Sequence, residues 1–265
     1  MNKTRIDWAD MTWNPVTGCL HGCEYCYARK IAQRFGNRYL PYGNGKANLL
    51  TEPHDGDNGI DPYPFGFEPT LHEYRLSDPV KIKKSQTIFV CSMADLFGDW
   101  VPDEWIQKVF DACEKAPQHR YLFLTKNPKK YSEIRTNASR SISISRTLRD
   151  QMWLGATATT QNQYNTTSSA LEDADQTVNT FLSIEPILEP ITEPASAYGI
   201  DCFANWVIVG SETGNRKDKP IVCKWWIDDI AKQCRAANVP IFMKESLRSL
   251  MGDDFKQEFP WEAQQ

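Results

Sequence analysis

Three cysteines stand close together near the N-terminus, in the stretch Gly18-Cys19-Leu20-His21-Gly22-Cys23-Glu24-Tyr25-Cys26. Three residues separate Cys19 from Cys23, and two residues separate Cys23 from Cys26. Cysteine thiolates are the usual protein ligands of iron–sulfur clusters. A loop with three thiolates can bind three irons of a four-iron cubane and leave the fourth iron open. The spacing therefore favours a 4Fe–4S cluster held by Cys19, Cys23 and Cys26.

Two other interpretations of these cysteines stay open. A zinc ion needs a fourth ligand, which His21 could supply, but structural zinc sites usually take ligand pairs from segments a dozen or so residues apart. Inert thiols or a disulfide suit a secreted protein, and the N-terminal sequence has no apolar region typical of a signal peptide. The other cysteines are too widely spaced to favour a second cluster, although Cys202, Cys223 and Cys234 leave that alternative open.

Composition limits the class of protein. The chain has 265 residues, of which 41% are hydrophobic and 24% charged, and this length is within the range of one α/β barrel. No apolar run approaches the roughly 20 residues of a membrane span. We therefore expect a cytoplasmic protein with no membrane partner, whose eight cysteines are reduced thiols or ligands. The formal net charge of −4 gives no overall field that would attract a polyanion.

Short apolar runs recur after Pro79 at intervals typical of strand–helix units. Continuous apolar runs indicate strands buried on both faces, and therefore parallel strands. Helical spacing of apolar residues occurs at Tyr27–Phe35, before these runs, and between them at Ile106–Cys113 and Trp226–Cys234. With an N-terminal strand over Thr4–Trp13, the sequence predicts an α/β fold, a partial (β/α) barrel of about six or seven parallel strands in a single domain over residues 1–265. The apolar runs are Thr87–Val90, Tyr121–Leu124, Met152–Leu154, Phe181–Ile184, Trp206–Val209 and Ile241–Met243.

The segment from Gly36 to Pro79 differs from the rest, because it is rich in Gly, Pro, Asp and Asn. It reads as a long irregular insertion, and insertions of this length are commonly functional covers or disordered linkers. Scattered aromatic residues favour a packed cover that closes one side of the active-site mouth and contacts substrate. These aromatics are Tyr39, Tyr42, Tyr63, Phe65 and Phe67.

Polar residues follow almost every apolar run. The carboxyl ends of parallel strands form the active-site face of α/β folds. We therefore expect these residues to converge on one mouth together with the cysteine loop. They are Ser92, Asp95, Thr125, Lys126, Thr157, Thr159, Glu185, Ser211, Glu212, Lys244 and Glu245.

The cysteine motif has the form Cys-x3-Cys-x-aromatic-Cys, and it resembles that of the radical S-adenosylmethionine (SAM) superfamily. The resemblance implies a 4Fe–4S cluster whose open iron binds the amino and carboxylate groups of SAM, with Tyr25 beside the adenine. It also implies that an external donor supplies an electron for reductive cleavage of SAM. The resulting 5′-deoxyadenosyl radical then abstracts hydrogen from the substrate.

A second resemblance covers nearly the whole chain. The motifs look like those of a phage- and bacterium-encoded family of radical-SAM-like proteins of poorly known function. The chain departs from that family at Thr157-Ala158-Thr159-Thr160, where the family tends to carry Ser-Val-Glu-Asn, and at Ser211, which replaces a glycine. The matching stretches are Trp13 to Cys19, Cys23 to Ala28, Ser92 to Phe97, Leu124 to Lys126, Glu185-Pro186, Trp206 to Gly210 with Glu212 and Gly214, and Phe242 with Lys244.

These resemblances imply roles for the polar residues. Ser92 and Asp95 are expected near the methionine part of SAM, and Glu185 and Glu212 are candidates for its ribose or amino group. Lys126 and Lys244 are the catalytic candidates, expected to contact a carboxylate or a substrate phosphate. Further cofactor-binding candidates are Thr125, Thr157 and Ser211.

A phage-type relative suggests a nucleotide or nucleic-acid substrate, for which the acidic net charge gives no independent support. The alternative from another functional class is a zinc-stabilised module that binds nucleic acid without catalysis.

Overall fold

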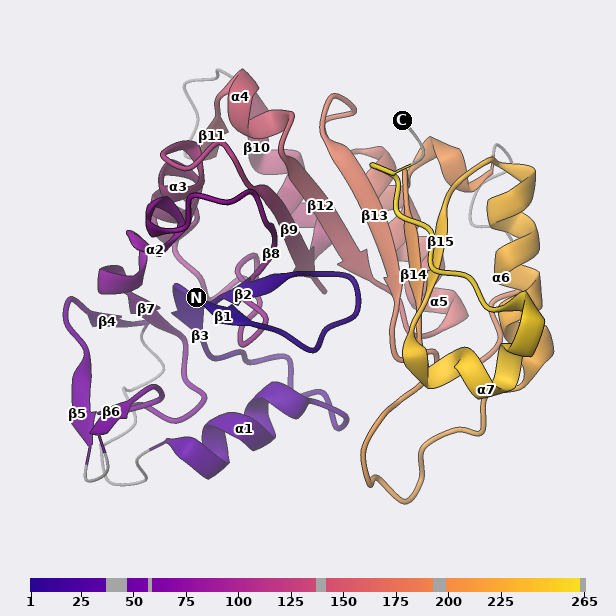
Figure 1. The fold of residues 1–265 in the computed structure, drawn as a ribbon, viewed down its shortest axis with the longest axis horizontal. Coiled ribbons are helices and arrows are strands. Elements are labelled where there is room, and N and C mark those ends of the chain that lie inside the picture. Colours follow the sequence, from indigo (N-terminus) through magenta and orange to yellow (C-terminus); the bar gives the residue numbers. More distant parts are fainter. Residues whose placement is uncertain (37–46, 57–58, 137–141, 193–198, 263–265) are drawn as a thin grey trace. The chain divides into compact units, whose positions relative to one another are not determined.

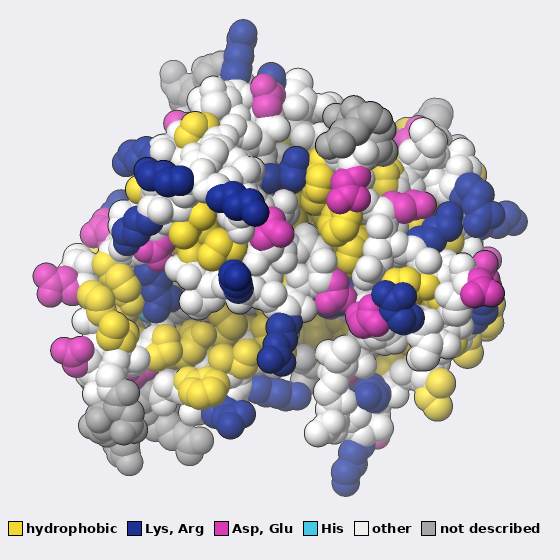
Figure 2. Space-filling view, viewed as in Figure 1, with side chains coloured by type: hydrophobic (Ala, Val, Ile, Leu, Met, Phe, Trp, Pro, Cys, Tyr) yellow, Lys and Arg dark blue, Asp and Glu magenta, His cyan; other side chains and the backbone are white. Residues whose placement is uncertain are grey.

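The computed structural model describes residues 1–36, 47–56, 59–136, 142–192 and 199–262. It divides into two compact units, Met1–Met152 and Trp153–Gln265, which are described separately below (Figure 1). The single domain expected from the sequence stays a prediction. Charges of both signs are spread over the face drawn in Figure 2, in keeping with the small net charge of −4. None of the described helices is long and apolar enough to cross a membrane.

The first unit contains a largely parallel sheet in the order β1-β2-β8-β9. β2 is parallel to β8, and β8 is parallel to β9, as predicted from the apolar runs. The predicted strand over Thr4–Trp13 was wrong in extent, because β1 is antiparallel to β2 and the chain reverses between them. The carboxylate of Asp10, in this reversal, accepts a hydrogen bond from the backbone N–H of Thr87 at 2.7 Å. The strands are β1 (Asn2–Lys3), β2 (Met11–Trp13), β8 (Thr87–Val90) and β9 (Arg120–Thr125).

Two predicted helices of the first unit are confirmed, α1 (Tyr27–Phe35) and α3 (Asp103–Glu114). Phe110 of α3 contacts Phe123 of β9 with ring centroids 5.4 Å apart, which joins the helix to the sheet. Smaller elements complete the unit. They are α2 (Asp78–Lys81), α4 (Arg146–Arg149), the parallel pair β10 (Ile134–Thr136) and β11 (Ile142–Ile144), and the 3-10 helices η1 (Glu73–Arg75) and η2 (Pro128–Glu133).

The insertion is more regular than the sequence predicted. β7 (Thr70–His72) pairs with β3 (Val16–Thr17) and with β4 (Asn48–Leu50) in a three-stranded sheet. β5 (His54–Gly56) and β6 (Gly59–Asp61) form a hairpin. Pairing with β3, directly before the cysteine loop, gives this part of the chain backbone partners that its composition does not reveal. Tyr39 and Tyr42 lie outside the described residues.

The second unit contains a parallel sheet in the order β12-β13-β14-β15. Its strands match the predicted apolar runs, and they are β12 (Met152–Thr157), β13 (Asn179–Ile184), β14 (Val207–Val209) and β15 (Ile241–Met243). The largest helix, α6 (Lys224–Ala236), buries Ile227, Ile230 and Cys234. Trp226, predicted on this buried face, is only half-buried, because Ile227 takes the inward position one turn before Ile230. The other helices are α5 (Gln161–Glu172), α7 (Arg248–Met251), η3 (Ile200–Cys202), η4 (Glu245–Leu247) and η5 (Gly252–Asp254).

Trp206 is the centre of an aromatic cluster in the second unit. Its ring contacts residues of neighbouring strands, including Phe242 at 6.0 Å and Phe181 at 5.8 Å between centroids. Its indole N–H donates to the carbonyl of Glu258 at 2.9 Å, which holds the C-terminal segment against the sheet. This segment also pairs with β15, because the N–H of Met243 donates to the carbonyl of Lys256 at 2.8 Å. The cluster therefore gives the second unit a core of its own.

Gly18, at the end of β3, should be intolerant of any side chain. It has a φ of +89°, and an added Cβ would lie 2.2 Å from the carbonyl oxygen of Glu68. We expect Gly18→Ala to lower the free energy of unfolding by about 3 kcal/mol, from backbone strain and overlap together. Gly22→Ala is the matched control, because its φ is +72° but its Cβ would meet nothing within 4 Å. Its cost should be about 1 kcal/mol in urea unfolding, and equal costs for both variants would contradict the close approach.

His72 should make stability depend on pH. Its Nε2 lies 2.8 Å from the hydroxyl of Thr17, and burial, aided by the nearby Arg75 charge, lowers its pKa from 6.5 to about 3. Between these values the unfolded chain binds a proton that the folded chain does not. Stability is therefore complete above pH 6.5 and falls as the pH falls, by about 2 kcal/mol at pH 5. His72→Gln, which cannot titrate, should reduce this slope in urea unfolding at pH 5 and 7.5. An unchanged slope would show that other groups cause it.

Candidate metal centre

The cysteine loop lies between β3 and α1, and Arg29 ties its two ends together. Cys26 is the N-cap of α1, where its Sγ accepts a hydrogen bond from the backbone N–H of Arg29 at 3.3 Å. The Arg29 guanidinium donates to the carbonyl of Cys19 at 3.1 Å and lies over the ring of Phe67, 5.0 Å from its centroid. Phe67 belongs to the insertion, and its carbonyl also accepts from the N–H of Cys19 at 3.2 Å. The insertion therefore packs directly on the loop, while its predicted role as a cover of the active-site mouth stays a prediction.

The electrostatics of the loop suit a cationic guest. Burial raises the pKa of Cys19 to about 12, although the nearby backbone N–H of His21 lowers it in part. The negative charges of Asp95, Cys23 and Cys26 raise this pKa further, so the three thiols are within electrostatic reach of one another. Metal ligation requires deprotonated thiols, and bound iron supplies the positive charge that this group lacks. The donor set therefore fits a cluster with three cysteine ligands.

The thiols do not already form a preassembled site for one ion. In the described part of the chain, no group of three or more His, Cys, Asp or Glu side chains is arranged to hold a metal ion. The Sγ of Cys26 is engaged by the helix N-terminus instead. Metal binding by these three cysteines stays a prediction.

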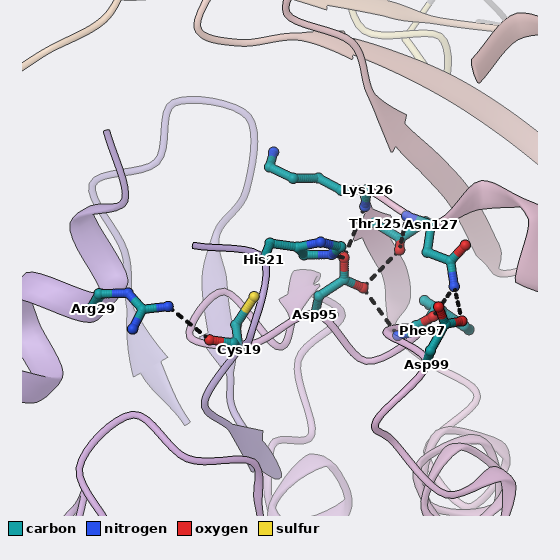
Figure 3. Close-up of polar contacts among 9 residues, drawn as sticks. All are labelled: Cys19, His21, Arg29, Asp95, Phe97, Asp99, Thr125, Lys126 and Asn127. Atoms are coloured by element: carbon teal, nitrogen blue, oxygen red, sulfur yellow. Dashed lines mark hydrogen bonds and ion pairs between the residues drawn. The ribbon is translucent and has the colours of Figure 1, made fainter. Parts of the chain in front are cut away.

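Asp95 lies at the centre of a buried network that joins the loop to the sheet (Figure 3). Its Oδ1 accepts from the hydroxyl of Thr125 at 2.7 Å and from the N–H of Phe97 at 3.1 Å. Its Oδ2 accepts from the N–H of Lys126 at 2.8 Å and lies 2.7 Å from Nε2 of His21. Protein groups thus occupy both oxygens of the carboxylate, so Asp95 has a structural role. Its position near the methionine part of SAM stays a prediction.

Ser92 lies beside the loop through contacts with Asn14. The Ser92 hydroxyl donates to Oδ1 of Asn14 at 3.1 Å, and the same oxygen accepts from the N–H of Met93 at 2.9 Å. The hydroxyl of Tyr27 donates to the Ser92 carbonyl at 2.8 Å. Gly18 bridges to Ala94, so the segment after β8 runs parallel to the start of the loop. Here the structure brings together two stretches that the sequence predicted to converge.

Lys126 and Tyr25 also lie together. The Lys126 ammonium is over the Tyr25 ring, 5.6 Å from its centroid. Among the described residues, no carboxylate forms an ion pair with this half-buried ammonium. A flat ring with an unneutralised cation above it can accept a ligand that combines a π-face with negative charge.

The polar residues of the second unit pair with one another. Lys244 forms a close ion pair with Glu185, and its side chain lies against Gly210, where a Cβ would be 2.9 Å from it. Glu212 pairs with Arg216 at 2.7 Å, and its side chain is only 5% exposed. The residues Glu185, Gly210 and Lys244 follow β13, β14 and β15, so they share the carboxyl edge of this sheet as predicted.

The remaining candidates of the second unit are also placed. Thr157 ends β12 and is buried, while the N–H of Ser211 donates to the hydroxyl of Ser246 at 3.2 Å. The departure from the family at Thr157–Thr160 has a local use, because the Thr160 hydroxyl caps α5 and Thr159 bonds Gln163. Proximity of these residues to the cysteine loop stays a prediction.

Sequence reasoning missed three residues around the candidate metal centre. His21 was considered only as a zinc ligand, whereas its side chain bonds Asp95. Asn14 and Arg29 lie in stretches that the sequence analysis used, but neither was assigned a role in the site. The position of His21 between Cys19 and Cys23 was the one sequence signal that could have identified it as a site residue. The sequence carries no such signal for Asn14, because its contacts are with segments distant in sequence, nor for Arg29, whose contact with Phe67 crosses the insertion.

Comparisons with known proteins agree with the α/β fold. The chain resembles spore photoproduct lyase, a radical SAM enzyme, in a complex with dinucleoside spore photoproduct, with 7% identity and a TM-score of 0.53. A cysteine-to-serine variant of the same lyase gives 10% identity and a TM-score of 0.51. Each match covers 92% of this chain and 79% of the lyase chain, and at such identities it shows the fold alone.

Sequence comparison adds the family. No curated protein matches the chain. The profile of the family described as protein of unknown function DUF5131 matches residues 3–250, which is most of the chain. The chain therefore belongs to the DUF5131 family.

Proposed function

We propose that the protein is a radical SAM enzyme. The observation that carries the proposal is the three-cysteine loop at the carboxyl end of a strand, on a fold similar to that of a radical SAM lyase. Cys19, Cys23 and Cys26 would hold a 4Fe–4S cluster and leave one iron for SAM. When bound, the cluster supplies the electron that splits the sulfonium of SAM, and SAM supplies the group that abstracts hydrogen from substrate.

The chain's own residues bind, orient and shield the reactants in this proposal. Phe67 and Arg29 cover Cys19 and exclude water from that side of the loop. Tyr25 offers its ring to the adenine of SAM, and Ser92 lies where it can contact the methionine part. Lys126 supplies a cation for a carboxylate or phosphate. We also propose Thr157, Glu185, Ser211, Glu212 and Lys244 as site residues, and a partial barrel as the fold.

The proposed substrate is a nucleotide or nucleic acid. Its support is that the lyase of similar fold was solved with a dinucleoside photoproduct. The unneutralised Lys126 cation beside the Tyr25 ring suits a base with an attached phosphate. The electron would come from an external donor, and we propose the cytoplasm as the compartment, where thiols stay reduced.

Cluster binding is tested by cysteine replacement. Cys23→Ala should remove most of the iron that the protein binds on anaerobic reconstitution, because a cubane held by two thiolates is labile. Cys223→Ala is the control, since Cys223 is exposed and distant in sequence, and its iron content should equal that of the wild type. Iron and sulfide are measured per chain. Equal iron loss in both variants would contradict a single three-cysteine cluster, and zinc without iron in the wild type would favour a non-catalytic binding module.

Turnover is tested with SAM and a strong reductant. The wild type should release 5′-deoxyadenosine and methionine slowly even without substrate, measured by chromatography and mass spectrometry. Lys126→Met, which keeps a long apolar side chain without the charge, should reduce the affinity for SAM or nucleotide about tenfold if the ammonium contacts an anion. Lys129→Met, a change of an exposed lysine nearby in sequence, should have no such effect. If SAM leaves the electron paramagnetic resonance spectrum of the reduced cluster unchanged, the proposed mechanism is wrong.

A further inference from the structure

His21 connects the cysteine loop to a segment distant in sequence. It lies between Cys19 and Cys23, and its Nε2 is 2.7 Å from Oδ2 of Asp95, 74 residues further along the chain (Figure 3). The side chain of Asp95 is 6% exposed and that of His21 is 22% exposed. The His21 ring also packs on the ring of Trp100 in a T-shaped arrangement, with centroids 4.8 Å apart at an interplanar angle of 77°. Both contacts hold the ring in one orientation.

The other partners of Asp95 indicate which atom donates the hydrogen in its bond with His21. The carboxylate accepts from the backbone N–H groups of Phe97 and Lys126 and from the hydroxyl of Thr125. An ionised carboxylate can only accept hydrogen bonds, so Nε2 of His21 carries the hydrogen and donates. That nitrogen is therefore committed to Asp95 and is not free to bind a metal. A charge-assisted bond at this distance is among the stronger hydrogen bonds in proteins.

The backbone of His21 acts on a predicted ligand. Its N–H lies close enough to the thiol of Cys19 to lower the pKa of that thiol. Hydrogen bonds to cluster sulfurs and exclusion of solvent are two means by which a protein sets the potential of an iron–sulfur cluster. Holding the His21 side chain on Asp95 also fixes the position of this N–H beside Cys19. The fixed ends of β8 and β9 thereby determine the environment of Cys19.

We propose that His21 is a positioning residue of the metal centre, which acts through its side-chain bond to Asp95 and thereby fixes the loop between Cys19 and Cys23. The inference deepens the proposed function and rests on it for the cluster, but the link itself is made by two protein side chains. Outer-shell partners of metal ligands commonly affect affinity and potential, although they never touch the metal. His21 fills that place from within the loop.

The test compares three variants with the wild type. His21→Ala removes the bond, and His21→Gln restores it, because the amide N of Gln reaches a position similar to that of Nε2. Leu20→Ala is the matched control, since Leu20 is the neighbouring loop residue and is 45% exposed. Apo protein is treated with iodoacetamide, and the alkylation rate of Cys19 is measured by peptide mass spectrometry. Thermal unfolding of each apo protein shows that the fold is retained, and His21→Asn, too short to reach Asp95, replaces His21→Ala if the latter does not fold.

The same proteins are then reconstituted with iron and sulfide. In apo His21→Ala, we expect alkylation of Cys19 about tenfold faster than in the wild type, because one charge-assisted bond no longer holds the loop closed. After reconstitution, His21→Ala should retain iron but show a changed reduction potential and electron paramagnetic resonance spectrum. Both His21→Gln and Leu20→Ala should resemble the wild type.

Three results would overturn the inference. The first is His21→Ala with wild-type alkylation, potential and spectrum. The second is His21→Gln behaving like His21→Ala, which would show that the bond to Asp95 is not the cause. The third is iron loss in His21→Ala as complete as in Cys23→Ala, which would make His21 a ligand. A wild type that binds no iron would instead contradict the proposed function, and the alkylation rates would still decide whether the link to Asp95 holds the loop.

Discussion

The buried carboxylate of Asp95 is the interaction on which the candidate centre depends. A buried charge is costly unless it is fully hydrogen-bonded, and here two backbone N–H groups, one hydroxyl and one imidazole provide the bonds. These donors come from three separate stretches of the chain. Because these donors all bond the same carboxylate, the cysteine loop, the turn after β8 and the end of β9 are fixed relative to one another. A buried polar network whose members are hydrogen-bonded in this way makes the surrounding structure rigid and favours one arrangement of the chain.

The insertion completes the same region from the other side. β7 pairs with β3, and Phe67 covers Cys19 while its ring supports the Arg29 guanidinium. The loop is therefore confined by a sheet edge, a helix N-terminus and an aromatic ring. Such confinement makes a thiolate costly without a neighbouring cation, which explains the raised pKa of Cys19. The arrangement is consistent with a site that is completed by a positively charged guest.

In the second unit, half-buried and buried charged side chains are neutralised by ion pairs. Lys244 and Glu185 neutralise one another at the carboxyl edge of the sheet, and Glu212 is neutralised by Arg216. The pair at Lys244 also requires Gly210, because a side chain there would occupy the space of the lysine stem. Charged groups held in this way are preorganised, and a polar ligand can exchange with one partner without a large loss of hydrogen bonds. This is the physical basis for keeping Glu185 and Lys244 among the site candidates.

Local patterns in the sequence determined the elements. The helix bounds of α1 agree with helical spacing, and the strands β8, β9, β12, β13, β14 and β15 agree with apolar runs, because these signals depend on residues only a few positions apart. The cysteine spacing likewise identified the metal candidates from nine neighbouring positions, Gly18 to Cys26. β7 of the insertion was missed, because it pairs with β3 and β4, which are distant in sequence.

Only the tertiary structure decided which side chains meet. His21 bonds Asp95 across 74 residues, His72 bonds Thr17 across 55, and Lys244 pairs with Glu185 across 59. No periodicity encodes such pairs, since each depends on how strands order themselves in a sheet and on which buried polar group still lacks a partner. The sequence by itself thus determined the candidate ligands and the elements beside them, while the fold decided that a histidine inside the motif bonds a carboxylate.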